Sequence, residues 1–173
     1  MTTTTSRTLN DVDLDAVGAL VEAIQNDPGK AGTTWKSTVE WRGGFRSASR
    51  SREFAPAESD EPVALGGEDT APNPVEQLLG ALGNCLAVGY AANATAAGIE
   101  LKDLRIELEG ELDLHTFLGL TDGNAGYETI RANVSIDSDA DAETLQNLHE
   151  KVIATSPVGH TLSRAVPVEV ALA

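Results

Sequence analysis

The sequence predicts an α+β fold built around a mostly antiparallel sheet. Apolar side chains recur every three or four residues in some segments, as in helices, and every second residue in others, as in strands. The strand-like segments are segregated from the three helical ones, and this separation favours antiparallel pairing. With 173 residues, of which 41% are hydrophobic, the chain is long enough for one domain with its own core.

The N-terminal part predicts a tail followed by a helical extension. Residues 1–9 are expected to form a disordered tail. Residues 10–29 carry the pattern of an amphipathic helix, with Asn10 or Asp11 as a candidate cap, and its apolar side chains must lie against another surface. We expect residues 10–173 to form a single domain that includes this extension.

The segment 34–54 predicts a β-hairpin. Polar and apolar residues alternate on both sides of Gly43-Gly44, a pair that suits a tight turn. The hairpin holds four of the eight arginines in the chain, namely Arg42, Arg46, Arg50 and Arg52. This concentration indicates either a charged edge strand that resists aggregation or a patch that attracts anions. Residues 55–72 predict a loop with one short strand near Val63–Leu65.

A central helix is predicted from Asn73 to about Ala97. Asn73 suits the N-cap, and Glu76, three positions later, completes a capping box. Gly98 provides a C-terminal stop. Beyond Glu76 the helix has no charged residue and many small ones. We therefore expect it to be buried on most sides, against a similar helix or a partner subunit.

Further strands and another helix complete the predicted fold. Alternating apolar residues indicate strands over residues 104–108, 127–136 and 166–172. The last of these contains Pro167, which favours an edge position. The helix is expected to begin at Ser138 or Asp139 and to end at Ser156-Pro157.

Charge and composition exclude several classes of function. The formal net charge of −15 disfavours nucleic acids and anionic membranes as partners. No apolar run is long enough to span a membrane, and the polar start lacks a secretory signal, so we expect a cytoplasmic protein. Cys85 is the only cysteine, so no disulfide can form within the chain. The three histidines, His115, His149 and His160, lack a metal-binding spacing, and no metal or organic cofactor is implied.

Three segments carry a resemblance to a known family. The first, residues 72–86, is Pro-Asn-Pro-Val-Glu-Gln-Leu-Leu-Gly-Ala-Leu-Gly-Asn-Cys-Leu, a helix start that leads through small residues to a cysteine. The others are residues 109–120 with Gly126-Tyr127, and residues 155–170. Together they resemble the OsmC/Ohr superfamily of osmotically inducible and organic hydroperoxide reductase proteins. The similarity covers about residues 9–173 and is to a branch with an N-terminal helix and without the family's second cysteine.

The resemblance implies an OsmC-like fold with two central helices, in an intertwined homodimer whose active sites lie between subunits. It also implies reduction of small organic hydroperoxides in the oxidative or osmotic stress response. In the family, a first cysteine attacks the peroxide and a second condenses with the resulting sulfenic acid. These positions correspond to Cys85 and Ser156. Serine cannot form a disulfide, so an external thiol reductant would have to resolve a sulfenate on Cys85.

The reactive form of cysteine is the thiolate, which a neighbouring cation stabilises. Cys85 lies in mid-helix, so an arginine rather than a helix terminus has to supply the charge. The family places this arginine near a Gly-Gly turn of the first hairpin, which corresponds to Arg46 or, as the alternative, Arg42. The family's glutamate that holds it corresponds to Glu76. Without these roles, Glu76 is a capping residue, the arginines belong to a solvated strand face and Cys85 is a small core residue.

Glu76 and Cys85 cannot touch within one helix. They are nine positions apart, which places them about 13.5 Å apart along the axis and on opposite faces. A shared site therefore needs a second element or a second chain. Ser156 and His160 flank the expected pocket as candidate binding residues. Ser156 could hydrogen-bond Cys85 or only end a helix, and His160 could move protons or be structural.

These observations leave two main functions open. One is a one-cysteine thiol peroxidase that reduces small organic hydroperoxides with an external thiol. The other is a non-catalytic dimer that holds a small apolar ligand. A structural or salt-stress role without a small-molecule site is compatible with the composition alone.

Overall fold

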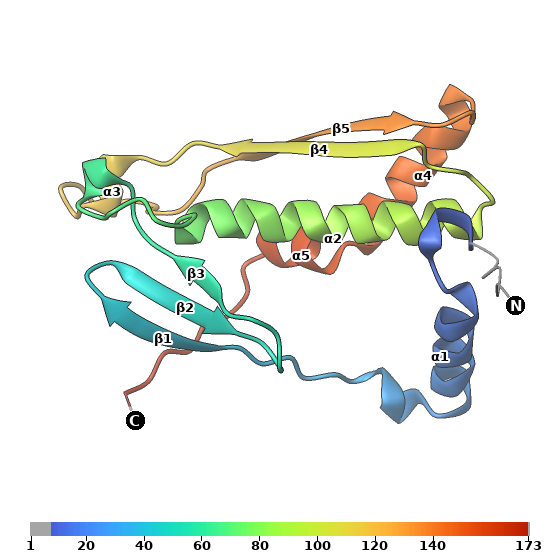
Figure 1. Cartoon of the computed structure of the whole chain (residues 1–173), viewed down its shortest axis with the longest axis horizontal. Coiled ribbons are helices and arrows are strands. Elements are labelled where there is room, and N and C mark those ends of the chain that lie inside the picture. The colour runs from blue at the N-terminus through green and yellow to red at the C-terminus, as the bar shows by residue number, and fades with distance from the viewer. Residues whose placement is uncertain (1–7, 173) are drawn as a thin grey trace, which may run out of the picture. The chain divides into compact units, whose positions relative to one another are not determined.

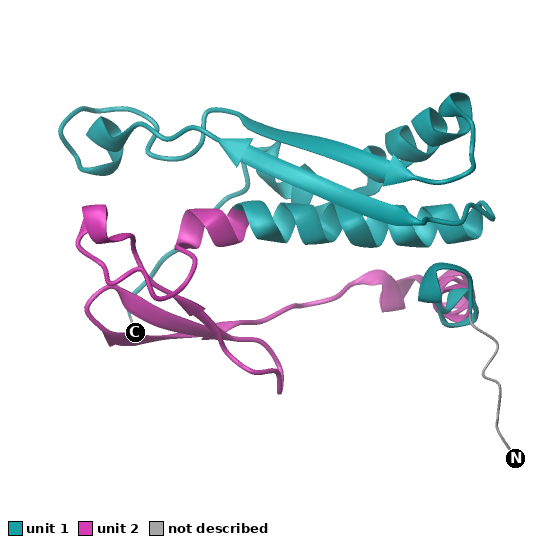
Figure 2. Ribbon diagram, turned by 45° about the horizontal axis from the view of Figure 1, so that its top comes forward, with its two compact units in different colours: residues 1–16, 79–173 teal, residues 17–78 magenta. Residues whose placement is uncertain are grey.

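The computed structural model describes residues 8–172 and confirms the predicted α+β fold with antiparallel sheets (Figure 1). The chain forms two compact units (Figure 2). We call residues 1–16 with 79–173 the core unit and residues 17–78 the hairpin unit. Most of the predicted tail, residues 1–7, lies outside the described residues.

The core unit is built along helix α2 (Pro74–Ala96), whose first five residues belong to the hairpin unit. The unit's other elements are the 3₁₀ helix Leu9–Asp11, β4 (Asp103–Gly110), α3 (Leu114–Phe117), β5 (Ile130–Asp137), α4 (Ala142–Thr155) and α5 (Pro157–Leu162). Strands β4 and β5 pair antiparallel and run alongside α2 (Figure 1). Strand β4 includes the predicted residues 104–108, whereas β5 begins at Ile130 and not at residue 127.

One hydrophobic cluster joins α2, the β4–β5 sheet and α4. Its buried members are Leu82, Leu86, Tyr90, Ala94, Ile99, Leu148 and Val152. Along β4, half-buried residues that pack on this cluster alternate with exposed ones. This is the burial pattern expected of a strand with one face on the core.

Helix α2 is buried on one face only. Leu82, Leu86 and Tyr90 are buried, whereas Val88 is 70% exposed. In the single chain the sheet and α4 cover one side of α2 and leave an uncharged face open, so burial of that face against a partner subunit stays a prediction. Among residues 8–172, no helix combines the length and the apolarity needed to cross a lipid bilayer.

The ends of α2 follow local rules and confirm the sequence prediction. The Asn73 side chain accepts a hydrogen bond from the Glu76 N–H, and the Glu76 carboxylate accepts one from the Asn73 N–H, each at 2.9 Å. Gly98 follows the helix with φ of 72°, a conformation that favours glycine. The helix therefore begins and ends where the sequence places it.

Helix α1 (Leu14–Asn26) forms as predicted, but its cap differs. The Ala16 N–H donates to the Asp13 carboxylate at 3.0 Å, so Asn10 and Asp11 are not the cap. The Asn10 amide instead donates to the Ile99 carbonyl and accepts from the Leu101 N–H, each at 2.9 Å. None of the residues of α1 is buried, so the surface that its apolar side chains require is absent from the single chain.

The hairpin unit contains a three-stranded antiparallel sheet in the order β1-β2-β3. Its elements after α1 are the 3₁₀ helix Pro28–Ala31, β1 (Thr38–Gly43), β2 (Arg46–Arg50), β3 (Ala57–Ser59) and the 3₁₀ helix Val63–Leu65. Gly43 and Gly44 turn the hairpin with φ of 95° and 59°. The short strand predicted near Val63–Leu65 is wrong, because a local bond from the Leu65 N–H to the Pro62 carbonyl closes a 3₁₀ turn there.

Two further predictions in the C-terminal half need correction. Helix α4 is capped by Asp141, whose carboxylate accepts from the Thr144 N–H at 2.7 Å, and not by Ser138 or Asp139. Residues 166–172 form no strand, although their apolar residues alternate. A strand needs a neighbour for its backbone hydrogen bonds, and Val168 and Val170 are 82% and 92% exposed. The segment is therefore without a partner in the single chain.

Candidate functional site

Cys85 lies on α2 where this helix meets the end of α4. Its Sγ is 3.3 Å from the Oγ of Ser156, and either atom can be the donor. Cys85 is half-buried, and Ser156 is only 5% exposed. The two residues are far apart in sequence, so it is the packing of α4 on α2 that makes this contact.

Ser156 has a second role at the junction of two helices. It ends α4 and is the N-cap of α5, and its Oγ accepts a hydrogen bond from the Gly159 N–H at 3.1 Å. Pro157 has no N–H and suits the first position of the new helix. Since a hydroxyl oxygen can accept and donate together, the Ser156 O–H remains available to Cys85. The capping role and the contact with the sulfur therefore coexist.

The close approach of α4 to α2 depends on Gly89, one turn beyond Cys85. A Cβ at this position would lie 2.9 Å from Cγ1 of Val152, closer than carbon atoms normally approach. Val152 is 1% exposed and lies one helical turn before Ser156. A side chain at position 89 would push α4 outward and lengthen the Cys85–Ser156 contact.

A groove of about 400 Å³ opens beside the sulfur. It is lined by Asn84, Cys85, Val88, Gly89, Ala92, Val152, Thr155, Ser156 and Pro157. None of these residues is charged, and most are apolar. The groove suits a small apolar molecule, and any cation that stabilises a Cys85 thiolate has to come from outside this lining.

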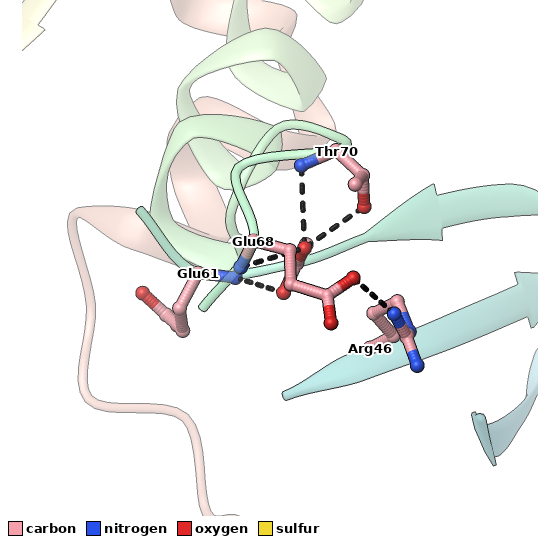
Figure 3. A network of polar contacts seen from close by, with 5 residues as sticks. Arg46, Glu61, Glu68 and Thr70 are labelled. Atoms are coloured by element: carbon pink, nitrogen blue, oxygen red, sulfur yellow. Dashed lines mark hydrogen bonds and ion pairs between the residues drawn. The ribbon is translucent and has the colours of Figure 1, made fainter. Parts of the chain in front are cut away.

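The candidate cation Arg46 is on β2 in the hairpin unit. Its guanidinium forms an ion pair with Glu68, and both side chains are more than a third exposed. Asp60 holds the loop that presents Glu68 (Figure 3). Arg46, Glu68 and Asp60 belong to one unit, whereas Cys85 and Ser156 belong to the other. A contact between Arg46 and Cys85 stays a prediction.

Asp60 is the centre of this loop. It is 1% exposed, and its carboxylate accepts from the N–H groups of Glu61, Glu68 and Thr70 and from the Thr70 hydroxyl, at 2.8 to 3.2 Å. Burial alone would raise the pKa of Asp60, but the hydrogen bonds from Thr70, Glu61 and Glu68 outweigh it and hold the pKa below its ordinary value. The ionised carboxylate therefore organises the loop at neutral pH.

The other candidates from the hairpin are engaged locally. Arg42 forms an ion pair with Glu40 at 2.6 Å. Glu76 completes the capping box with Asn73. Arg42 also borders a small concavity of about 170 Å³ whose lining includes Arg50. The roles of Arg42 and Glu76 at a shared site stay predictions.

His160 lies on α5 and pairs with Arg164. Its Nδ1 is 2.7 Å from Nη2 of Arg164. A guanidinium only donates, so this Nδ1 accepts and carries no hydrogen. In this arrangement His160 can donate only through Nε2. It is on the segment that follows Ser156, but it does not line the groove beside Cys85.

Two features of the structure were missed by the sequence analysis. One is the Asp60 loop, whose bonds join residues up to ten positions apart in a segment without a period. The other is a contact between the Tyr90 hydroxyl and His149 in the core unit. Tyr90 is the only aromatic residue in a helix of small residues, and this was the available signal. Within residues 8–172, no cluster of three or more potential metal ligands occurs.

Comparison with protein families identifies one match. A family model described as OsmC-like protein matches residues 66–171. This range contains both helices that carry Cys85 and Ser156, and both strands of the core unit. A comparison with curated protein sequences gives no match.

Solved structures share the fold at low sequence identity. An OsmC-like protein from Mycoplasma pneumoniae has a TM-score of 0.66 at 20% identity, over 76% of this chain and 88% of that one. An organic hydroperoxide resistance protein OsmC from Legionella pneumophila has a TM-score of 0.58 at 16% identity, over 76% and 91%. An organic hydroperoxide resistance protein from Elizabethkingia anophelis has a TM-score of 0.57 at 18% identity, over 75% and 89%. At such identities the likeness shows the fold alone.

Proposed function

The chain belongs to the OsmC-like protein family, and from this premise we propose that it reduces small organic hydroperoxides with Cys85 as the attacking thiol. The observation that carries the proposal is the Cys85–Ser156 contact beside an uncharged groove. The names of the structural relatives from Legionella pneumophila and Elizabethkingia anophelis support hydroperoxides as the substrate class. A small alkyl or aryl hydroperoxide matches the groove, because its organic part is apolar.

The proposed reaction has two stages. The Cys85 thiolate attacks the outer oxygen of the hydroperoxide, the O–O bond breaks, and the alcohol leaves after taking up one proton, while the sulfur becomes a sulfenic acid. An external thiol then displaces water to form a mixed disulfide with Cys85. A second external thiol releases Cys85 as the thiol and leaves as the oxidised disulfide. The two thiols supply the two electrons that the peroxide receives.

Ser156 is proposed to orient the sulfur and to hydrogen-bond the sulfenate. Its Oγ is fixed by the Gly159 N–H, so its O–H can point toward the sulfur at little entropic cost. Because serine cannot take the place of a resolving cysteine, turnover requires the external thiol. The reducing cytoplasm that we propose as the location would supply such a thiol.

Arg46 is proposed as the cation that stabilises the thiolate, with Arg42 as the alternative and Glu76 as the residue that holds the arginine. Support comes from the uncharged lining of the groove, which leaves the charge to be supplied by another part of the protein. A partner subunit is one source of this charge. The departing alcohol takes its proton from solvent, and His160, which does not line the groove, is proposed only as a binding residue near it.

The first experiment follows hydroperoxide consumption and sulfenate formation together. The wild-type protein is mixed with cumene hydroperoxide, with and without dithiothreitol, and a dimedone adduct at Cys85 is measured by mass spectrometry. We expect turnover only with the thiol present, and an adduct after peroxide alone. A C85S protein that consumes the peroxide at the wild-type rate would overturn the proposal.

A matched pair at position 156 tests the proposed role of Ser156. We expect S156A to keep the dimedone adduct but to form it more slowly, because the hydrogen bond to the sulfur is lost. We expect S156C to lose the adduct, because a cysteine at this place can trap the sulfenic acid as an intrachain disulfide. Equal adduct yields in all three proteins would contradict the assignment of this residue.

We also propose that the active form is a homodimer. Two features support it: the open uncharged face of α2, and the unpaired alternating segment 166–172 with its exposed valines. Such a segment can add to a sheet edge of a second copy. Sedimentation of the full chain should give a dimer, and a chain shortened after Arg164 should give a monomer. A monomeric full chain would overturn this proposal.

A second candidate function is a non-catalytic dimer that binds a small apolar ligand. It is favoured by one observation: Cys85, the only cysteine in the sequence, contacts Ser156 and not a second cysteine, beside an apolar groove. In this case the wild type forms no dimedone adduct, while cumyl alcohol raises the melting temperature of wild-type and C85S proteins alike. Turnover of hydroperoxide by the wild type decides for the enzyme.

A further inference from the structure

A second concavity in the core unit lies between β5 and α4 and has no role in the reaction above. Its volume is about 410 Å³. It is lined by Tyr90, Ala132, Asn133, Val134, Ile136, Ala142, Leu145, Gln146 and His149. It shares no lining residue with the groove beside Cys85. Most of its lining is apolar, with two amide side chains and one tyrosine–histidine pair.

The tyrosine–histidine pair fixes the state of the imidazole. Tyr90 is 0% exposed, and its hydroxyl contacts Nδ1 of His149, with the two rings stacked at 6.1 Å between centroids. Burial raises the pKa of Tyr90, so the hydroxyl keeps its proton at neutral pH. A buried O–H donates to the acceptor within reach, and here this is Nδ1. With Nδ1 as the acceptor of the Tyr90 O–H, the ring hydrogen of His149 is on Nε2.

This geometry leaves one directed donor at the pocket. His149 is half-buried and lines the concavity, and Nε2 is across the ring from the atom that Tyr90 holds. Among residues 8–172, no buried side-chain nitrogen or oxygen lacks a hydrogen-bond partner, so this Nε2 is not a buried orphan and can donate to water or to a ligand that enters the pocket. Gln146 is occupied in part, since its amide donates to Glu150 at 3.0 Å. A ligand oxygen can take the place of water as the acceptor of the Nε2 hydrogen.

The surrounding charge selects the kind of oxygen. No lysine or arginine is among the lining residues. Four carboxylates stand next to lining residues in sequence, namely those of Asp137, Asp141, Glu143 and Glu150. Arg131, beside Ala132, is the one cation placed in the same way, and it pairs with Glu109 and Glu111. The four carboxylates disfavour an anionic ligand. A neutral oxygen on an apolar molecule can accept the hydrogen bond from Nε2, and the nearby carboxylates do not repel it.

We propose that this pocket binds a small neutral carbonyl compound, whose oxygen accepts from Nε2 of His149 while its apolar part packs on β5 and α4. Tyr90 is the positioning residue, because it holds the imidazole in the tautomer that donates. The inference does not rest on the proposed chemistry of Cys85, and its test runs equally well in the C85S protein.

Three probes of similar size test separately the carbonyl oxygen, the apolar contact and the effect of a negative charge. Acetophenone has a carbonyl oxygen, ethylbenzene has none, and benzoate is an anion. Each is titrated into the ¹⁵N-labelled full chain, and the imidazole nitrogen signals are followed by NMR, with the His149 signals identified by their loss in H149Q. We expect acetophenone to shift the His149 Nε2 signal in a saturable way. Ethylbenzene should bind roughly three- to tenfold more weakly, the range of one net hydrogen bond.

Matched variants place the probe in the pocket. A132F fills the concavity from an exposed position on β5, whereas S135F puts the same ring at another exposed position of that strand that does not line the pocket. We expect A132F to abolish the saturable shift and S135F to leave it unchanged. Y90F keeps the ring and removes the donor to Nδ1, so it should weaken acetophenone binding and leave ethylbenzene binding as it was.

Several outcomes would overturn the inference. These are the absence of a saturable shift with acetophenone, benzoate binding as tightly as acetophenone, and a shift that persists in A132F. Backbone amide spectra of each variant show whether it is folded, and S135F serves as the folded reference for A132F. If Y90F is unfolded, H149F takes its place, because phenylalanine keeps a ring but has no Nε2 donor, and acetophenone binding is then followed by the backbone amide signals.

Discussion

Different interactions stabilise the core unit and the hairpin unit, each within itself. In the core unit, a cluster of buried apolar side chains joins α2, the sheet and α4. In the hairpin unit, the buried residues are Ala48, Ser59 and Asp60. Its tryptophans, Trp35 and Trp41, are 80% and 76% exposed. One unit is stabilised by apolar burial, the other mainly by strand pairing and the polar bonds of the Asp60 loop.

This difference identifies the surfaces that the proposed dimer would cover. Apolar burial is the dominant favourable contribution to folding, and the hairpin unit has little of it. Large exposed apolar patches mark interaction surfaces in proteins. The exposed tryptophans of the hairpin, the open face of α2 and the unpaired segment 166–172 are all accounted for if a second copy covers them, as the proposed dimer requires.

The largest expected effect on stability comes from shortening a buried side chain of the core unit. Leu148 is 5% exposed and belongs to the cluster, so L148A should lower the free energy of unfolding by about 2–5 kcal/mol. Val39 on β1 is 64% exposed in the single chain, so V39A should change the free energy of unfolding by no more than about 0.5 kcal/mol where no second copy covers this face, and by more in the proposed dimer. Urea unfolding of both variants measures the contrast. Similar losses in the two would show that the hairpin face is buried in solution, as in a stable dimer.

A pair of glycines on α2 tests the close contact between the helices. G89A introduces the Cβ that meets Val152, and such overpacking should destabilise the protein by about 1–3 kcal/mol. A Cβ added at Gly80 would have nothing within 4 Å, and G80A should stabilise by about 0.5–1 kcal/mol through helix propensity. The signs are opposite on one helix, and thermal unfolding reads both. G89A should also slow sulfenate formation, because it moves Ser156 away from Cys85.

The predictions that succeeded depend on neighbours in sequence. The capping box of Asn73 and Glu76, the stop at Gly98 and the turn at Gly43-Gly44 each need only residues a few positions away. Predictions from local chemistry also failed in places, since α1 and α4 are capped by residues other than those predicted and Val63–Leu65 is a 3₁₀ turn, but two larger differences between the prediction and the single chain depend on distant partners. Segment 166–172 has the alternation of a strand but no strand beside it, and the uncharged α2 has a partner on one face only. The composition of a segment shows which of its side chains favour burial, whereas the fold determines which of them are buried.

The candidate site shows the same division. Cys85 and Ser156 could be paired in advance because the resemblance supplied two positions that meet in space. Asp60 and Glu68, which hold the loop beside Arg46, gave no signal because nothing local distinguishes them from the other acidic residues of segment 55–72. The pair of Tyr90 and His149 depends on the packing of α4 on α2, which no periodicity specifies.

The Asp60 loop should make the hairpin unit sensitive to acid. The pKa of Asp60 is lowered in the folded protein, so its contribution to stability is complete above the ordinary value of 3.8 and is lost as pH falls through the folded value. D60N should lower stability at pH 7 and flatten the acid limb of the stability curve. Urea midpoints between pH 7 and pH 2.5 test this, with D69N on the same loop as the control. An unchanged acid limb in D60N would contradict the assignment.

The smallest effect on stability is expected from a substitution of Glu68. The same substitution tests whether Arg46 or Arg42 activates Cys85. The ion pair of Glu68 with Arg46 is exposed, so E68Q should change the free energy of unfolding by only about 0–1 kcal/mol. It nevertheless frees Arg46 from a competing carboxylate. If Arg46 is the cation beside the Cys85 thiolate, E68Q should speed formation of the dimedone adduct, and E40Q, which frees Arg42 in the same way, should not. The reverse result would assign the role to Arg42. Unchanged rates in both variants would mean that neither carboxylate competes with the sulfur, and that the hairpin arginines do not activate Cys85.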